Sequence, residues 1–173
     1  MDKRYLLIIV ILIMGCSTLY FITNASYSIG SATATLGNSI FSLPEGFSVD
    51  HSEKNYVSIL NNDGVYMHIN VVNGKKDDNY NGTLSYLSRK NIPIVSSGSI
   101  NVKDIVVDSV FYNKTEHNST SRSNDNVYGA FFIFNKQNRT FNIEVTHFDY
   151  ADKNKIIHYA EHIVNSIDKN YLV

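Results

Sequence analysis

Hydrophobic and polar side chains alternate along two pairs of segments, which is the pattern of β-strands that bury one face. The four segments are residues 56–60, 65–72, 127–134 and 139–148. Asp63-Gly64 precedes the second segment, and this dipeptide favours a hairpin turn whose two central residues need positive φ. Polar residues 135–138 link the other pair. The pattern therefore predicts two β-hairpins.

Two other segments carry hydrophobic residues at the three- and four-residue spacing of a helix. Residues 83–90 place Leu84 and Leu87 on one side, and this short helix should end before Pro93. Residues 149–168 predict a long C-terminal helix that lies on the sheet. Its hydrophobic stripe consists of Ile156, Ile157, Ala160, Ile163, Val164 and Ile167.

Short β-rich stretches predict the remaining strands, at residues 39–43, 94–95, 100–102 and 105–112. Residues 113–126 contain no hydrophobic side chain, so we expect a solvated loop there. Because hairpins rather than helical crossovers join most strands, the expected fold class is α+β with a largely antiparallel sheet.

The beginning of the chain has a different pattern. Lys3 and Arg4 are followed by residues 5–22, which carry no charge. As a helix this stretch would be about 27 Å long, close to the ~30 Å hydrocarbon core of a bilayer. Basic residues precede it and the next one is Lys54, so the positive-inside rule leaves the N-terminus in the cytoplasm. We expect residues 1–23 to be a membrane anchor or signal segment, with the rest of the chain on the extracytoplasmic side of the cell membrane.

Three fates of this segment stay open. An uncleaved signal anchor would keep it whole as a single N-terminal pass. A lipoprotein signal would be cut before Cys16, and that cysteine would carry the lipid. An ordinary signal peptidase could cut after Ala25, where small residues precede the bond.

Residues 24–36 are small and polar without periodicity and are expected to form a tether, so the folded domain should cover residues 37–173. Cys16 is the only cysteine of the 173-residue chain. The exported domain therefore has no disulfide and no cysteine nucleophile, and its core must supply the stability. Lys plus Arg number 15 and Asp plus Glu 16, a balance that argues against nucleic acid as a partner.

The sequence resembles the PsbP-like family from residue 38 to residue 169. Residues 40–47 read I-F-S-L-P-E-G-F, similar to the opening F-x-L/I-P-x-G-F/W of these domains. The order of hairpin, short helix, strands, aromatic hairpin and final helix is also similar. The resemblance implies a curved antiparallel sheet between helices, an α/β/α sandwich. The family includes a photosystem II subunit, a nuclear Ran-binding protein and small exported proteins. The resemblance therefore implies a binding or assembly module that has no catalytic motif and no cofactor.

One string matches a catalytic motif. His158 to His162 read H-Y-A-E-H, which fits the inverted zinc-peptidase pattern. Both histidines lie one helical turn apart, as zinc ligands do, but only Asp168 follows as an acid. They also fall on the polar side of the helix, so we expect them to face water and expect no metal site.

Other polar and aromatic residues suggest surface roles. Glycosylation sequons occur at Asn24, Asn81, Asn113, Asn118 and Asn138, and we expect all of them in loops or the tether. Outward tyrosines such as Tyr112 and Tyr128 are candidates for a groove that takes a partner or a sugar.

Two function hypotheses follow. The first is a non-enzymatic binding or scaffold module, tethered to the membrane, that docks an envelope protein or surface component. The alternative is a small metal-dependent hydrolase that uses His158 and His162.

Overall fold

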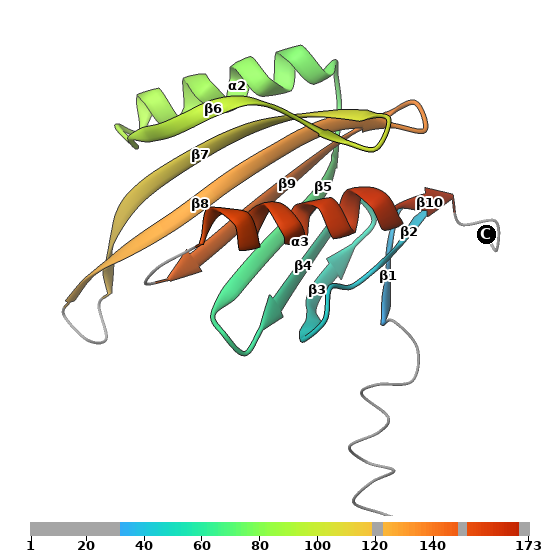
Figure 1. Cartoon of the computed structure of the whole chain (residues 1–173), viewed down its shortest axis with the longest axis horizontal. Helices are drawn as coiled ribbons and strands as arrows, with labels where there is room; N and C mark the ends of the chain where they lie inside the picture. Colours follow the sequence, from blue (N-terminus) through green and yellow to red (C-terminus); the bar gives the residue numbers. More distant parts are fainter. Residues whose placement is uncertain (1–31, 119–122, 149–151, 170–173) are drawn as a thin grey trace, which may run out of the picture. The chain divides into compact units, whose positions relative to one another are not determined.

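A computed structural model describes residues 32–118, 123–148 and 152–169, all within one compact unit, Ala32–Val173. Its larger sheet is antiparallel throughout, in the order β3-β4-β5-β9-β8-β7-β6 (Figure 1). These strands are β3 (Phe47–Glu53), β4 (Tyr56–Asn61), β5 (Val65–Val72), β6 (Ile94–Val102), β7 (Ile105–Asn118), β8 (Ser123–Lys136) and β9 (Arg139–Phe148).

A smaller sheet joins the two ends of the described chain. Its strands are β1 (Thr33–Leu36), β2 (Ser39–Ser42) and β10 (Asp168–Lys169), with β2 in the middle. The turn after Pro44 is closed by the Phe47 N–H, which donates to the Pro44 carbonyl oxygen at 3.1 Å. Gly46 has a φ of 81° there, a conformation that glycine adopts readily.

The two helices cover opposite faces of the larger sheet. Helix α3 (Lys153–Ser166) packs with the small sheet on the face that carries the main core, including Phe132, Phe134 and Phe141. Helix α2 (Lys76–Arg89) packs on the other face over a smaller cluster, formed by Leu87, Val110, Tyr112 and Phe131. Strands β7 and β8 bend along their length (Figure 1). The expected α+β class, with a curved antiparallel sheet between a short helix and a C-terminal helix, is confirmed.

Helix α3 follows its hydrophobic stripe. Ile156, Ala160 and Ile163 are among its buried residues, and Asp152 caps the N-terminus by accepting from the Asn154 N–H at 2.9 Å. At the other end, Lys136 Nζ donates to the Val164 carbonyl oxygen at 2.7 Å, satisfying a terminal carbonyl of the helix. The helix is shorter than the expected 149–168, and residues 149–151 lie outside the described part.

Both predicted hairpins form, but their turns differ from the expectation. In the first, only Gly64 has a positive φ, 75°, and its N–H donates to the Asn61 carbonyl oxygen at 3.3 Å. The Asn61 side chain also accepts from the N–H groups of Asp63 and Val65, so an asparagine organises this turn. In the second, Gln137 and Asn138 both have positive φ, and residues 135 and 136 belong to β8 rather than to a linker.

Several polar strands were not expected from the pattern. Residues 113–118 and 123–126 form strands rather than the expected loop, because β7 and β8 stay paired from Asn113↔Tyr128 to Asn118↔Ser123. Strand β3 has only Phe47 buried, which is why alternation does not reveal it. Strand β1 lies within residues 24–36, which we expected to form a tether. That expectation is wrong for residues 33–36. The polar stretches of β3, β7 and β8 depend on backbone hydrogen bonds, which a hydrophobic pattern does not report, whereas β1 buries Ala34 and Leu36.

Helix α2 begins at Lys76, seven residues before the expected start at 83. Its first turn is polar, and Asp77 and Asp78 there interact favourably with the helix dipole. Residues 94–95 and 100–102 were expected as separate strands but form the single strand β6, with a bulge between Ile94 and Ser96.

No helix within the described ranges has the length and apolar character needed to cross a bilayer. The segment at residues 5–22 and Cys16 lie outside those ranges.

Strand β1 can be tested by truncating its buried side chain. Leu36 is fully buried in the main core, so Leu36→Ala should lower the free energy of unfolding by about 2–4 kcal/mol. The neighbouring Thr35 is exposed, and Thr35→Ala should change it by less than about 0.5 kcal/mol. Urea denaturation measures both; equal, small effects would mean that residues 33–36 are a tether after all.

Candidate functional site

The two histidines of the metal motif lie on α3 at different depths. His158 is exposed, whereas His162 is half-buried and its Nε2 lies 3.1 Å from Ser42 Oγ. Both line a hollow of about 460 Å³ with Pro44, Glu45, Lys155 and Tyr159. His162 is therefore less exposed than His158, although it still lines this surface hollow. Among residues 32–118, 123–148 and 152–169, no three His, Cys, Asp or Glu side chains are grouped to hold a metal.

The sequons do not all lie in loops. Asn138 is exposed in the β8–β9 turn, as expected. Asn81 is exposed on helix α2, and Asn113 and Asn118 belong to strand β7. The Asn113 side-chain oxygen is buried, which makes that sequon a poor acceptor of a bulky glycan. Asn24 lies outside the described residues.

Tyr112 and Tyr128, which we expected to point outward and line a groove, are not exposed. Tyr112 is buried against α2 and Tyr128 is half-buried. Tyr66 on β5 and Tyr86 on α2 are instead 36 % and 43 % exposed. The sequence pattern does not reveal them. The exposure of Tyr66 depends on how far α2 covers the sheet, and Tyr86 lies on α2 itself.

Helix α2 covers only part of its sheet face and leaves a groove beside it. Two adjoining hollows of about 440 and 390 Å³ share Tyr86 and Glu144. We call them together the α2 groove. Its further lining includes Tyr66, His68, Asn79, Lys114, Asn142 and Thr146. The Asn142 side-chain oxygen in this lining is buried and has no hydrogen-bond partner.

A band of polar side chains crosses the sheet at the floor of this groove. Tyr56 OH lies 2.6 Å from His68 Nδ1, and the two rings stack with centroids 5.7 Å apart. His68 stands opposite Glu144 in the β5–β9 register. Tyr112 OH donates to Glu144 Oε1 at 2.6 Å. We call Tyr56, His68, Glu144 and Tyr112 the polar band; it joins β4, β5, β9 and β7.

A glycine makes the last link of the polar band possible. Strand β8 lies between β7 and β9, and Gly129 of β8 stands opposite Tyr112. The Tyr112 ring lies over this glycine, since a Cβ placed there would overlap the ring. The ring also packs against Phe131, with centroids 5.4 Å apart. Tyr112 thus spans β8 and holds the Glu144 carboxylate in place.

The α2 groove is suited to binding. Tyr66 and Tyr86 offer aromatic surface, which binds through apolar contact and a polar hydroxyl. Glu144 and His68 are held by hydrogen bonds from other side chains, so little conformational entropy is lost when they engage a ligand. Such a mixture of aromatic surface and a few fixed polar groups is typical of ligand and peptide sites.

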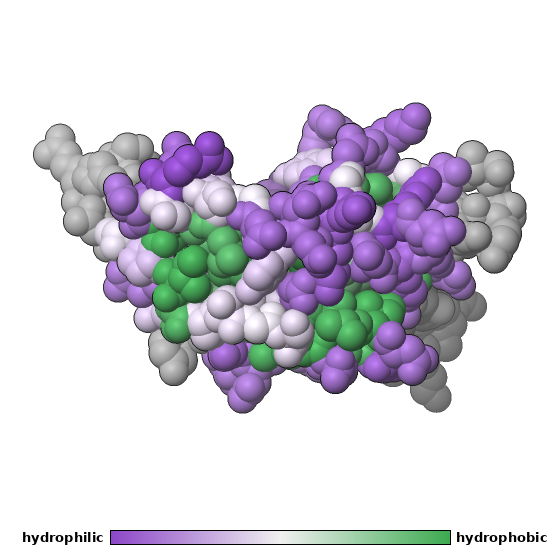
Figure 2. All heavy atoms as spheres, turned by 90° about the horizontal axis from the view of Figure 1, so that it is seen from above, coloured by the Kyte–Doolittle hydropathy of each residue, from purple (hydrophilic) through white to green (hydrophobic). Residues whose placement is uncertain are grey.

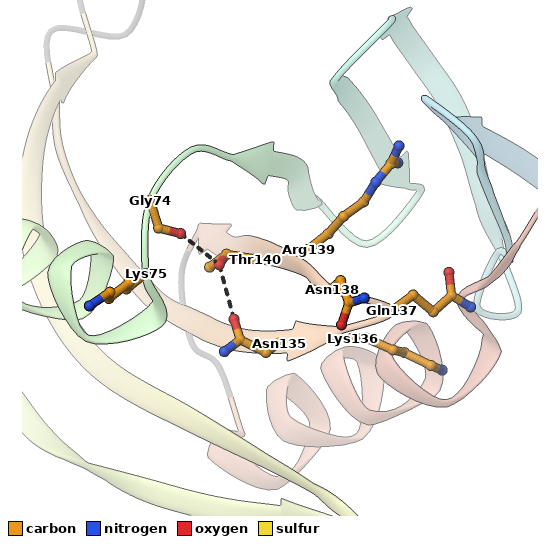
Figure 3. A pocket seen from close by; sticks show the side chains of 8 residues that line it. All are labelled: Gly74, Lys75, Asn135, Lys136, Gln137, Asn138, Arg139 and Thr140. Carbon is orange, nitrogen blue, oxygen red and sulfur yellow. Dashed lines mark hydrogen bonds between the residues drawn. The ribbon is translucent and has the colours of Figure 1, made fainter.

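A fourth hollow, of about 460 Å³ at the β8–β9 turn, is lined by residues that hold the structure together (Figure 3). Thr140 Oγ1 lies 2.9 Å from both the Gly74 carbonyl oxygen and Asn135 Oδ1. The side chains of Lys136 and Arg139 point away from Thr140 (Figure 3). Lys136 is engaged with α3, and burial lowers the pKa of its amine below the usual range. Lys136 and Arg139, which line this hollow, are therefore not gathered around a ligand site.

No family model and no curated protein matches the sequence. Solved structures match in fold. The Ran-binding protein Mog1p of Saccharomyces cerevisiae aligns with a TM-score of 0.51 at 7 % identity, over 82 % of this chain and 97 % of Mog1p.

Two other structures are similar at lower scores. A Bacteroides thetaiotaomicron protein aligns at 10 % identity and a TM-score of 0.49, over 76 % of this chain, which spans only 45 % of that protein. Cyanobacterial PsbP of Synechocystis aligns at 9 % identity and a TM-score of 0.45, over 82 % of this chain and 95 % of PsbP. The likeness to Mog1p, a Ran-binding protein, confirms the PsbP-like fold that the sequence led us to expect.

The crossing of Tyr112 over Gly129 can be tested with a double-mutant cycle. Gly129→Ala should lower the free energy of unfolding by about 1–3 kcal/mol, because the new methyl group overlaps the ring. In a Tyr112→Leu background the same change should cost less than about 0.5 kcal/mol.

Gly98→Ala is the matched control. It makes the same change in a strand where a Cβ would meet nothing within 4 Å, and its effect should stay within about 0.5 kcal/mol. An equal cost of Gly129→Ala with and without the tyrosine ring would contradict this arrangement.

Proposed function

We propose that this chain is a non-enzymatic binding or scaffold module held at the membrane by its N-terminal segment. The folded unit lies on the extracytoplasmic side, and the α2 groove binds part of an envelope protein or surface component. The exposed pair Tyr66 and Tyr86 beside the fixed Glu144 carboxylate is the observation that carries this proposal.

The composition of the α2 groove supports protein or glycan binding. Tyrosine is enriched at the energetic centres of interfaces because it buries much area at small entropic cost. Tyr66 lies on β5 and Tyr86 on α2. A ligand that contacts both rings therefore contacts the sheet and the helix at the same time. The polar band holds the floor rigid before binding.

The fold supports the same role. Mog1p, which has this fold, is named for binding another protein, Ran. The alternative hydrolase would need a third metal ligand beside His158 and His162, and the part of the chain that the structure describes offers none. A binding role requires no such addition.

Membrane tethering is supported by the sequence of residues 1–23. Two basic residues followed by an uncharged stretch of bilayer length direct a chain for export with its N-terminus inside. The near-neutral charge of the chain gives no reason to expect nucleic acid as partner.

The α2 groove can be tested by site-specific photo-crosslinking in native cells. A photoreactive phenylalanine analogue at Tyr66 or Tyr86 should give the same crosslinked product. The same analogue at Val49, an exposed hydrophobic position on β3, is the control and should give none. Products that form equally from Val49, or from neither tyrosine, would refute the groove as the binding surface.

A second test uses truncation of the aromatic rings. Tyr66→Ala with Tyr86→Ala should reduce recovery of the crosslinked partner at least tenfold, a loss of about 1.4 kcal/mol in binding. Recovery is measured by pull-down from solubilised membranes. Because both side chains are partly exposed, the melting temperature should change little, which separates lost binding from lost folding.

The N-terminal segment can be tested by fractionation and intact-mass measurement on native protein. We expect the protein in the membrane fraction, with residues 32–173 accessible to protease from outside. Full-length mass indicates a signal anchor, a lipidated chain starting at Cys16 a lipoprotein, and a chain starting at residue 26 a cleaved signal peptide. Full-length protein in the cytosol would contradict export.

A further inference from the structure

The smaller of the two hollows in the α2 groove, of about 390 Å³, carries negative charge. It lies between helix α2 and strands β8 and β9, and we call it the α2–β9 hollow. Its lining includes two acidic residues, Asp78 and Glu144, and no basic residue among those that the structure describes. Neither carboxylate forms an ion pair within the described ranges. The half-buried Glu144 therefore lacks a counter-ion there, which is costly for a charge removed from water.

The groups left over for a ligand in this hollow are mainly hydrogen-bond acceptors. The side chains of Asn79 and Thr83 already donate to main-chain carbonyl oxygens nearby. Asn142 Oδ1, by contrast, is buried and has no hydrogen-bond partner. Glu144 accepts from Tyr112 OH, and a carboxylate can accept about three hydrogen bonds more. A ligand suited to the α2–β9 hollow is therefore one that donates hydrogen bonds.

Helix α2 places an acidic residue, a gap and an aromatic ring one turn apart. Asp78, Gly82 and Tyr86 follow one another at four-residue spacing, so they share the face of α2 that lines the hollow. Glycine is a poor helix former, and close packing does not require it here, because a Cβ at Gly82 would meet nothing within 4 Å. Its effect is to leave space between the carboxylate and the ring.

The sheet supplies the opposite wall of the α2–β9 hollow. Asn142 and Glu144 are two residues apart on β9, so both side chains lie on the face toward α2. Phe131 of β8 stands opposite Glu144 and also lines the hollow. Tyr86, across the gap, is 43 % exposed. Flat aromatic surface therefore lies beside the unused acceptors.

We propose that the α2–β9 hollow binds an arginine side chain of the partner, an inference that rests on the proposed function of the α2 groove. A guanidinium is planar, always positively charged, and carries five N–H donors and no acceptor. It pairs with the carboxylates of Glu144 and Asp78, donates to Asn142 Oδ1 and stacks on the Tyr86 ring. Lysine offers the charge without the plane, and a sugar would leave both carboxylates without a counter-ion.

The basic residues around the hollow do not supply this cation. Lys76 forms an ion pair with a carboxylate of β7 at 2.8 Å, and Lys75 lines the separate hollow at the β8–β9 turn. Lys114 lines the adjoining hollow; it pairs with Val127, which is four residues, or about 14 Å, along β8 from Phe131. Seen from the α2 side, hydrophilic side chains cover much of the centre of the molecule (Figure 2). A charged ligand therefore approaches over polar surface.

Nuclear magnetic resonance titration of the full chain in non-ionic detergent micelles tests the proposal. The probe is the capped tripeptide Gly-Arg-Gly, and the comparison tripeptides carry lysine or citrulline, the neutral isostere of arginine. The arginine probe should shift the backbone amide signals of Tyr86, Asn142 and Glu144. The other two should bind at least fivefold more weakly, because citrulline lacks the charge and lysine lacks the planar set of donors.

Two substitutions, each with a matched control, locate the binding. Gly82→Leu fills the gap without removing an acceptor, and it should weaken binding of the arginine probe at least tenfold without lowering the melting temperature. Ser88→Leu, exposed on the same helix outside the hollow, should leave binding unchanged. Glu144→Gln keeps an acceptor for Tyr112 but removes the charge, and it should also weaken binding at least tenfold. Glu45→Gln, in the hollow beneath α3, should have no effect.

Several outcomes would overturn the inference. They are an arginine probe that leaves the three signals unmoved, a lysine or citrulline probe that binds equally well, and unchanged binding in Gly82→Leu or Glu144→Gln. Calcium chloride that shifts the same signals and displaces the arginine probe would assign the carboxylates to a metal ion instead.

The crosslinks from Tyr66 and Tyr86 are a separate readout. Crosslinks without arginine binding leave the α2 groove as the docking surface and remove only the arginine site. Arginine binding without crosslinks would keep the site and remove the groove as the surface that docks a partner in cells.

Discussion

Hydrophobic contact between helix α3 and one face of the larger sheet is the interaction on which the rest of the structure depends. The described residues contain no cysteine, so the burial of hydrophobic side chains, without disulfides, must supply their stability. Phe132, Phe134 and Phe141 are fully buried beneath the helix, and Phe134 and Phe141 stack with centroids 5.3 Å apart. With this face closed by α3 and the small sheet, the opposite face is left to α2 alone, which covers only part of it. The α2 groove is therefore a consequence of unequal cover: one helix and three strands close the first face, and one helix leaves the second partly open.

The sequence predicted those parts of the fold that bury hydrophobic residues at a regular spacing. The stripe from Ile156 to Ile167 gave the C-terminal helix, and alternation gave both hairpins, because each of these patterns reports a buried face. The pattern could not report strands held mainly by backbone hydrogen bonds. Residues 113–118 and 123–126 continue β7 and β8 without a hydrophobic side chain, and β3 buries only Phe47. The polar first turns of α2 were missed for a related reason: Tyr80, Leu84 and Leu87 contact the sheet, but the residues before them contribute charge rather than burial.

The candidate site was less predictable than the fold, because it is assembled across strands that are distant in the sequence. Tyr112 and Glu144 are 32 residues apart, and their hydrogen bond requires a glycine on a third strand. Sequence inspection singled out Tyr112, but as an exposed residue; its contribution is instead to hold a carboxylate at the floor of the groove. The histidine motif on α3 shows the opposite case. Its spacing is that of metal ligands, yet the fold gives His162 a serine neighbour and gives the pair no third ligand in the described part of the chain.

The small sheet also decides how the folded unit would respond to mechanical load. Residue 32 leads directly into β1, and the Ala32 carbonyl oxygen accepts a hydrogen bond from the Leu43 N–H at 2.7 Å. A pull on the chain at this point is directed at the open end of the β1–β2 hairpin, where Thr33 pairs with Ser42. Hairpins pulled from their open end separate one hydrogen bond at a time, at low force, whereas strands sheared along their length resist together. Strand β1 would separate from β2 starting at this end, opposed by the burial of Ala34 and Leu36 in the main core, while β2 stays paired with β10. The first contacts to break under such a load would therefore be those between Thr33 and Ser42, at the edge of the small sheet.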